Sequence, residues 1–279
     1  MLKVVKIGGN IVDNPEKLDR FLADFASIEG DKILVHGGGK VATTISKALG
    51  IETQMIDGRR VTDAETLKVV TMVYAGVINK SIVAKLRTSG VDAIGLSGAD
   101  GGFIVSKRRS PVPVEGHGLV DYGFVGDPEK VNTALAQELL GRGMTIVAAP
   151  ITLDGTRALG ISGGAEREGE GSGSLLNTNA DTVASAIATA MAGVGIETEL
   201  IYCFEKRGVL ADMGDENSVI PRIDRELYAS LKASGAIFEG MLPKLDNAFR
   251  ALDKGVAGVV ICSAEQIASP GYGGTTITI

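Results

Sequence analysis

Short runs of apolar residues alternate along this chain with longer segments in which apolar residues recur every three or four positions. The short runs have the length of β-strands and lie at residues 2–7, 32–36, 92–97, 144–150, 199–204 and 257–264. The longer segments have the period of helices and lie at residues 15–28, 40–49, 64–88, 128–140, 180–191, 225–233 and 245–253. Strands that alternate with helices are typical of an α/β protein.

Two of the predicted helices begin at residues that favour a helix start. Asn14 precedes Pro15, and proline is favoured in the first turn of a helix. Asn179 is a predicted N-cap, and Asp181 then places a negative charge in the positive first turn. These signals support the predicted boundaries of the helices at 15–28 and 180–191.

Two stretches between the periodic segments are irregular. Residues 101–126 contain the glycine, proline and aspartate signals that are typical of hairpins. Residues 153–174 contain the sequence GGAEREGEGSG, which we expect to form a mobile surface loop. The chain has no fixed-period repeat and no Pro/Ser-rich linker.

Composition and charge exclude several functional classes. The 279 residues include 28 Lys and Arg against 34 Asp and Glu, so the net charge is −6, and Trp is absent. Without a basic block the chain lacks the cationic surface of a nucleic-acid-binding protein. The N-terminus has no signal-peptide core, and the longest uncharged stretch, 182–196, is too short to span a bilayer. We expect a cytoplasmic protein, with Cys203 and Cys262 as buried apolar residues.

Glycine is unusually frequent, with 38 residues, and it clusters mostly just after apolar runs. The familiar nucleotide motifs are nevertheless absent, because the chain contains neither a P-loop nor a GxGxxG sequence. A GxSxG sequence occurs at 160–164, but a hydrolase would need a later histidine, and His36 and His117 both precede it. We interpret that match as chance.

Two glycine turns remain, and each follows a predicted strand. One reads KIGGN from Lys6, and the other reads HGGGK from His36. Glycine lets the backbone approach a ligand closely, and a following helix N-terminus adds partial positive charge, so adjacent turns of this kind form an anion-binding site. Lys6 would add a full charge there, unless it is a strand residue that points to solvent.

Three further polar groups fit an anionic ligand. Arg59 and Arg60 lie on a predicted turn, and arginine side chains bind carboxylates. Asn177, Asn179 and Asp181 alternate in an extended entry to a helix, so they project to one side, although capping alone explains Asn179 or Asp181. Lys244 ends a loop before another predicted helix, where a solvated lysine is the simpler interpretation.

Together these pieces resemble the amino acid kinase family along nearly the whole chain. The stretches that carry the resemblance are KIGGN, VHGGGK, GRRVTD, LLNTNADTVA, the GVL of KRGVL, GMLPKL and GGTTIT, in that order. The GGG, Gly-x-Arg-Val-Thr and Asn-x-Asn-Ala-Asp blocks resemble the branch that phosphorylates N-acetyl-L-glutamate. The carbamate, uridylate and aspartate kinases are similar mainly in the glycine turns and lysines.

The resemblance implies a fold, a reaction and an assembly. The fold is a three-layer αβα sandwich with a largely parallel central sheet. Its N-terminal lobe, 1–175, would bind the N-acyl glutamate and dimerise, and its C-terminal lobe, 176–279, would bind ATP, on one continuous sheet. The reaction transfers the γ-phosphoryl group of ATP to the side-chain carboxylate, in arginine biosynthesis. Mg²⁺ would arrive with ATP, because no Asp/Glu cluster forms a separate cage.

The resemblance also implies roles for matching residues. The catalytic set is Lys6, Lys244, Asp181, Gly9 and Gly39. The acid would be bound by Gly38, Gly39, Arg60, Asn177 and Asn179. The nucleotide would be bound by Lys6, Gly8, Gly9, Glu205, Gly208 and Lys244. A carboxylate is already ionised at pH 7, so this chemistry needs no general base, which is consistent with a site that lacks a catalytic histidine.

The chain departs from the family pattern in three places. The family has Ser/Thr-Asp before its Gly-Val-Leu, whereas this chain has Phe204 and Glu205. The stretch 156–173 is longer than the family's turn and is interpreted as a surface insertion. The first strand begins almost at Met1, whereas arginine-inhibited hexameric members carry an earlier helix, so we expect a homodimer without that feedback.

Two other functions remain open. The acyl group could be succinyl rather than acetyl, or the acid another amino-acid carboxylate, because one sequence does not define the acyl pocket. A non-catalytic sensor of amino acids or nucleotides is a remote alternative, and the presence of both lysines with Asp181 argues against it.

Overall fold

A single mixed sheet forms the centre of the molecule. The computed structural model describes residues 1–155, 174–212, 214–234 and 241–279. The strands of this sheet are β1 (Leu2–Ile7), β2 (Lys32–His36), β5 (Ala93–Leu96), β10 (Thr145–Ala148), β13 (Thr198–Phe204), β14 (Arg222–Ile223), β15 (Gly258–Ser263) and β16 (Thr275–Ile277). Their order is β14-β16-β15-β13-β1-β2-β10-β5, and only β14 and β16 among these described strands run against the others.

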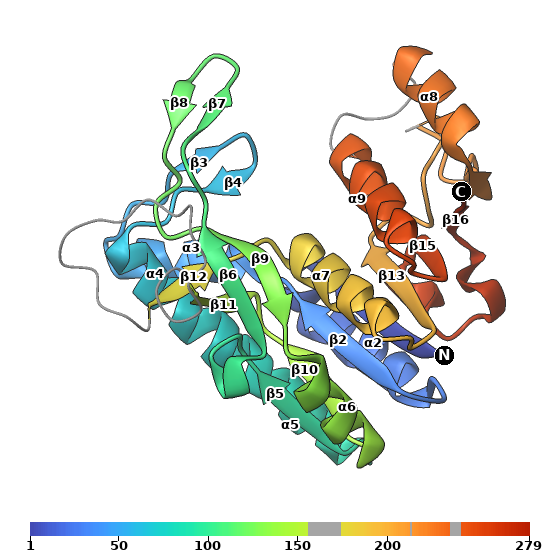
Figure 1. The fold of residues 1–279 in the computed structure, drawn as a ribbon, viewed down its shortest axis with the longest axis horizontal. Helices are drawn as coiled ribbons and strands as arrows, with labels where there is room; N and C mark the ends of the chain where they lie inside the picture. The colour runs from blue at the N-terminus through green and yellow to red at the C-terminus, as the bar shows by residue number, and fades with distance from the viewer. Residues whose placement is uncertain (156–173, 213, 235–240) are drawn as a thin grey trace.

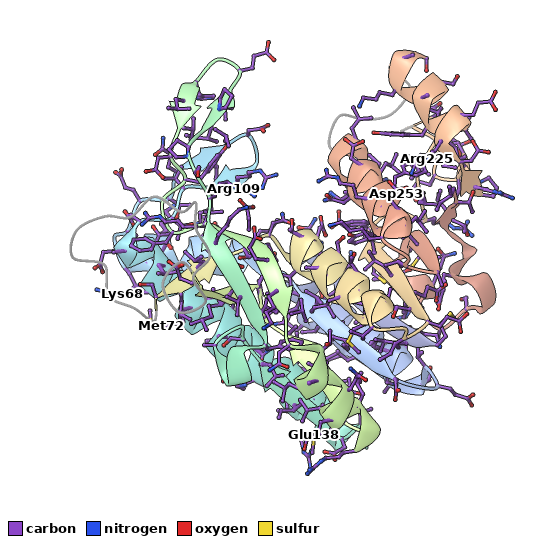
Figure 2. The ribbon with its side chains drawn as sticks, viewed as in Figure 1. Lys68, Met72, Arg109, Glu138, Arg225 and Asp253 are labelled. Atoms are coloured by element: carbon purple, nitrogen blue, oxygen red, sulfur yellow. The ribbon has the colours of Figure 1, made fainter. Side chains whose placement is uncertain are left out.

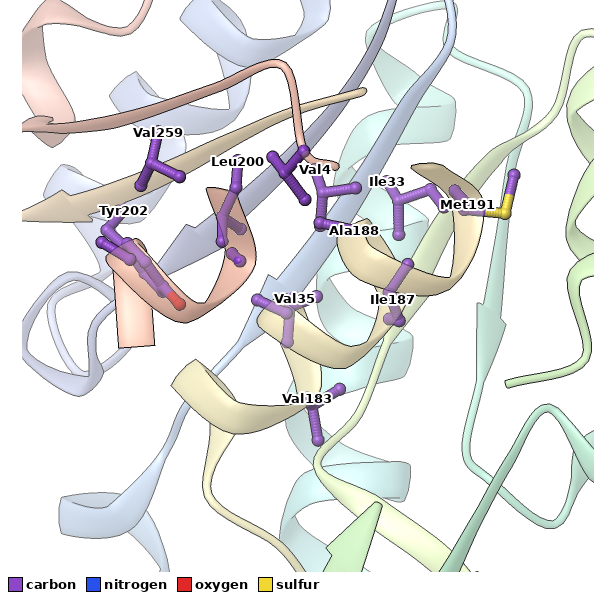
Figure 3. Packing of buried hydrophobic residues seen from close by; sticks show 14 of the residues in the cluster. Val4, Ile33, Val35, Val183, Ile187, Ala188, Met191, Leu200, Tyr202 and Val259 are labelled. Carbon is purple, nitrogen blue, oxygen red and sulfur yellow. The ribbon is translucent and has the colours of Figure 1, made fainter. Parts of the chain in front are cut away.

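Helices cover both faces of this sheet (Figure 1). Alternate strand residues such as Val4, Ile33 and Leu200 point to one face, where they pack against α6 (Thr133–Gly141), α7 (Ala180–Gly193) and α9 (Leu242–Asp253). Figure 3 shows α7 lying on this face. The intervening residues face α2 (Pro15–Ser27), α4 (Ala64–Thr71) and α5 (Asn79–Thr88). The predicted three-layer αβα fold is therefore confirmed.

One continuous helical run covers the predicted segment 64–88. It consists of α4, the π-helical segment η1 (Met72–Ile78) and α5. By length and composition this run is apolar enough to cross a membrane, but one side of it packs in the core through residues such as Val73 and Ile82. Met72 and Val77 are exposed on the other side, and Figure 2 shows Met72 on the outer surface of the helices.

The predicted helix at 128–140 is wrong in its first part. Residues Gly126–Val131 form strand β9, which pairs with β6 (Ile104–Arg108), and α6 begins only at Thr133. β9 is an edge strand of a second sheet, where Pro128 can lack an N–H donor at little cost. Asn132 then caps α6 by accepting a hydrogen bond from the Leu135 N–H.

The second sheet and two hairpins lie beside the N-terminal half. The sheet has the order β12-β11-β6-β9, with β11 (Ile151–Asp154) and β12 (Leu175–Asn177). β7 (Val112–Val114) pairs with β8 (Gly118–Val120), as the hairpin signals in 101–126 predict. β3 (Met55–Ile56) pairs with β4 (Arg59–Arg60), so the turn predicted at Arg59 and Arg60 lies two residues earlier and both arginines are in a strand. Figure 1 shows both hairpins projecting in the same direction, opposite α8 (Arg225–Ser234).

Two further sequence predictions concern the cysteines and the stretch at 153–174. Cys203 and Cys262 are buried free thiols on neighbouring strands, so the prediction that they fill the core is confirmed. The loop predicted at 153–174 lies largely outside the described residues, as do the GxSxG sequence and the interpreted insertion at 156–173.

His36 lies at the end of β2, fully buried, and it fixes the start of a glycine turn. Its Nδ1–H donates to the Gly37 carbonyl at 2.8 Å, so Nε2 accepts from Asn79 Nδ2 at 3.3 Å. Asn79 Nδ2 also donates to the Val147 carbonyl at 2.9 Å. Burial lowers the pKa of His36 to about 4, so the folded protein holds a neutral imidazole.

This buried histidine makes stability pH-dependent. Between pH about 6.5 and about 4 the unfolded chain binds a proton that the folded protein excludes, so the free energy of unfolding falls as pH falls through this range. The pKa difference corresponds to a loss on the order of 3 kcal/mol. Urea unfolding at a series of pH values should show a shallower decline for His36→Gln than for wild type.

The matched control is His117→Gln, which removes the other histidine at an exposed position. Parallel stability profiles for His36→Gln and wild type would contradict this assignment.

Candidate active site

The two glycine turns meet at the carboxyl edge of the central sheet. β1 and β2 are parallel neighbours, and each is followed by a helix, α1 (Gly9–Val12) or α3 (Gly39–Ala48). The Gly37 N–H donates to the Ile7 carbonyl at 3.2 Å, so the turns are in direct contact. The predicted pairing of the turns is therefore present.

Gly38 occupies a position that strongly disfavours any side chain. Its φ is +149°, and a Cβ there would lie 2.2 Å from Ile78 Cδ1 and 3.3 Å from Tyr74 Cδ1. Gly38 is also the N-cap of α3 and provides no side-chain cap. The start of α3 thus keeps its bare backbone beside the cavity, which is the arrangement that binds anions at helix N-termini.

Two lysines share one carboxylate in this region. Lys6 is 7% exposed at the end of β1, and its Nζ lies 2.7 Å from Asp181 Oδ1. Lys244, in the first turn of α9, places its Nζ 4.0 Å from Asp181 Oδ2. Asp181 lies in the first turn of α7, where the helix dipole favours a carboxylate. The burial of Lys6 rules out the alternative that this lysine points to solvent.

Two cavities adjoin this charge cluster. The first has a volume of about 250 Å³ and is lined by residues from the glycine turns, the β3–β4 hairpin, η1 and the start of α7. The second has a volume of about 580 Å³ and is lined by the glycine turns, the segment after β13 and the start of α9. Both cavities are lined by Lys6, Gly9, Gly39, Met55 and Arg60.

The predicted site residues divide between these cavities. The predicted acid-binding residues all line the first cavity, namely Gly38, Gly39, Arg60, Asn177 and Asn179. The predicted nucleotide-binding residues all line the second, namely Lys6, Gly8, Gly9, Glu205, Gly208 and Lys244. The lysine–aspartate cluster lies where the two sets meet, because Asp181 lines the first cavity and Lys6 lines both.

Arg60 is held rigidly but keeps one nitrogen without a partner. It is 8% exposed, and its Nη2 donates to the Gly39 carbonyl at 2.9 Å and to Thr43 Oγ1 at 2.8 Å. Its Nη1 is buried and has no hydrogen-bond partner among the described residues. Buried donors are normally satisfied, and Arg60 lines the first cavity, so this nitrogen is available to an acceptor atom of a ligand there.

The Asn-x-Asn-x-Asp stretch combines structural and site-lining roles. Asn177 Nδ2 donates to Thr62 Oγ1 at 3.0 Å, which ties the end of β12 to the segment after β4. Asn179 Oδ1 accepts from the Thr182 N–H at 3.1 Å, so the capping interpretation of Asn179 is correct. Both asparagines nevertheless line the first cavity, as the alternating pattern predicts.

The segment after β13, which is predicted to bind the nucleotide, differs from the family pattern in its chemistry. Glu205 is exposed, and Phe204, rather than a hydroxyl residue, lines the second cavity. Gly208 packs so closely that a Cβ would lie 2.7 Å from Thr275 Oγ1, and that hydroxyl accepts from the Val209 N–H at 2.8 Å. Within the described ranges no group of three or more His, Cys, Asp or Glu side chains could hold a metal.

Several lining residues were not predicted. Tyr74 comes from η1, and a π-helical segment shifts helix register in a way that periodicity does not reveal. Thr43 anchors Arg60 from the middle of α3. Met55, Val125 and Pro150 also line the first cavity. The sequence gives no signal for Met55, Val125 and Pro150, because apolar residues of this kind occur throughout the chain.

The fold and the cavities are those expected of the amino acid kinase family. The chain belongs to this family, because the family's model matches residues 1–263. The acetylglutamate kinase of Cytophaga hutchinsonii is 53% identical over 95% of this chain and 92% of its own. That of Phocaeicola vulgatus is 50% identical over 95% of both chains. Among solved structures, smu.665 from Streptococcus mutans has a TM-score of 0.71 at 24% identity, over 99% of this chain and 98% of that one.

Proposed function

We propose that this chain is an acetylglutamate kinase, which transfers the γ-phosphoryl group of ATP to the side-chain carboxylate of N-acetyl-L-glutamate in arginine biosynthesis. Relatives of that name at about 50% identity over nearly the whole chain support the proposal. The observation that carries it in the structure is the pair of lysines around Asp181 at the junction of the two cavities. This arrangement suits the transfer of a negatively charged phosphoryl group from one bound anion to another.

The mechanism needs charge neutralisation rather than a general base. A carboxylate oxygen of the acid attacks the γ-phosphorus, an O–P bond forms, the bond to the β-phosphate oxygen breaks, and ADP leaves. In our proposal Lys6 lies on the attacking side and Lys244 on the leaving side, while Asp181 orients both ammonium groups. The backbone of Gly9 and Gly39 offers N–H groups to the transferred phosphoryl and the reacting carboxylate.

The two cavities provide matching positions for the substrates. Arg60 Nη1 would pair with the α-carboxylate of the acid, and Asn177 and Asn179 would bind the same carboxylate and the N-acyl amide. ATP would occupy the second cavity, beside Glu205 and Gly208, and Mg²⁺ would reach the site on its phosphate oxygens. Residues of both proposed lobes, 1–175 and 176–279, line each cavity, so both substrates would lie between the lobes.

A second acid substrate has one observation in its favour. Arg59 lines the first cavity beside Arg60, so a second guanidinium is present for an acyl group that carries its own carboxylate. N-succinyl-L-glutamate has such a group. Phosphorylation of that compound is the alternative within the same reaction class.

A hydroxamate assay tests the proposed function. Hydroxylamine traps an acyl phosphate as a coloured hydroxamate, so the chain with MgATP and N-acetylglutamate should give product, with ADP formed in equal amount. N-succinylglutamate, glutamate and aspartate serve as comparison acids. Product from free glutamate or aspartate alone would refute the N-acyl specificity, and no product from any of the four acids would refute the function.

Variants of the charged residues should separate catalysis from binding. Lys6→Ala or Lys244→Ala should lower kcat by about two orders of magnitude or more, because each removes charge that stabilises the transition state. Arg60→Ala should mainly raise the KM for the acid, by about tenfold or more. The matched control is Lys68→Ala, which removes a lysine at an exposed position outside both cavities. An unchanged kcat for Lys6→Ala would contradict the role proposed for Lys6 in stabilising the transition state.

We also propose a homodimer in the cytoplasm, where ATP is available. Met72 and Val77 are 53% and 59% exposed on the continuous helix 64–88, and such an apolar helix face is suited to a second copy. Light scattering should give twice the chain mass of 28.9 kDa. Met72→Glu should shift the mass toward one chain, whereas Leu119→Glu, at another exposed apolar position, should not. A wild-type monomer would contradict this assembly.

A further inference from the structure

One aromatic ring contacts both lysines of the charge cluster. The Nζ of Lys6 lies over the ring of Phe204, 4.9 Å from its centroid. The Nζ of Lys244 lies over the same ring at 4.8 Å. These distances are within the range of attraction between a cation and a ring face. Phe204 therefore takes part in the same cluster as Asp181, although its side chain carries no charge.

The position of this ring is set by the sheet and by a second aromatic residue. Phe204 ends β13, beside β1, and the Gly8 N–H donates to the preceding carbonyl of Cys203 at 3.3 Å. Its ring stacks on Tyr202, with centroids 6.2 Å apart and planes at 19°. Tyr202 is buried, and its hydroxyl donates to the Asp181 backbone carbonyl at 3.3 Å. The ring and the carboxylate that contact the lysines are thus fixed to each other.

We propose that Phe204 is a positioning residue whose ring face, together with Asp181, holds the ammonium groups of Lys6 and Lys244 at the junction of the two cavities. The inference rests on the proposed function, because it assigns the ring's role to the same phosphoryl-transfer site. Two lysines and one aspartate leave one net positive charge, and the two ammonium groups repel each other. The ring attracts both cations but adds no formal negative charge.

This difference between a ring and an acid matters for the chemistry. A second carboxylate at position 204 would also attract the lysines, but it would cancel the positive charge that an anionic phosphoryl group needs. A hydroxyl at this position could contact a ligand but has no ring face for two cations. A ring at position 204 thus attracts both cations and keeps the net positive charge of the cluster.

Kinetics of position 204 test the inference. Phe204→Leu keeps an apolar side chain but removes the ring, so kcat with N-acetylglutamate should fall about tenfold while the KM for the acid changes less than about twofold. Phe204→Tyr and Phe204→Trp keep a ring face and should retain kcat within about threefold. The matched control is Phe249→Leu, which removes a ring that contacts Arg225 outside both cavities.

An unchanged kcat in Phe204→Leu would overturn the inference. Equal losses in Phe204→Leu and Phe204→Tyr would also overturn it, because a ring face would then have no effect of its own.

A magnetic resonance measurement is independent of turnover. Protons of the ε-CH₂ groups of Lys6 and Lys244 should be shifted upfield in the wild type by the ring current of Phe204, and Phe204→Leu should abolish both shifts. Lys6→Arg and Lys244→Arg identify the two signals. Wild-type signals without upfield shifts would overturn the inference, even if the chain phosphorylates the acid. Shifted signals in a chain that phosphorylates none of the four acids would support the contact and refute only the proposed function.

Discussion

The site depends on how the fold offsets the free-energy cost of placing two lysine ammonium groups together in a largely buried position. Removing a charge from water is unfavourable unless an opposite charge or a polar partner replaces the lost hydration. Here Asp181 is that partner, and it is itself stabilised by its position in the first turn of α7. The positions of β1, α7 and α9 in the fold are linked through this one carboxylate.

The parallel sheet supplies the second requirement, which is backbone for an anion to contact. Because β1 and β2 run in the same direction, their carboxyl ends place both glycine turns at one edge. The buried hydrogen bonds of His36 and Asn79 hold the start of the second glycine turn. Within that turn, a Cβ at Gly38 would clash with Ile78, so the backbone there stays bare. Cations and bare backbone thus converge where the two cavities meet.

Much of the fold, and many of the residues that line the two cavities, were predictable because they depend on local rules. The apolar runs mark the buried strands, and Asn14 and Asn179 cap helices as their sequence context predicts. The helix predicted from residue 128 fails because pairing with β6 outweighs local preference at an edge strand. Tyr74 was missed because the π-helical segment changes the register of a long helix. The contact of Phe204 with two lysines depends on three distant segments and has no sequence signature.

Isotope transfer tests the central claim that a carboxylate oxygen attacks the γ-phosphorus in this site. N-acetylglutamate labelled with ¹⁸O in its side-chain carboxylate is incubated with MgATP and hydroxylamine, and the released phosphate is examined by ³¹P magnetic resonance. Attack by the carboxylate places one labelled oxygen on phosphorus, so the account predicts phosphate that carries a single ¹⁸O. Unlabelled phosphate would contradict it, because the phosphoryl group would then have been transferred to another atom.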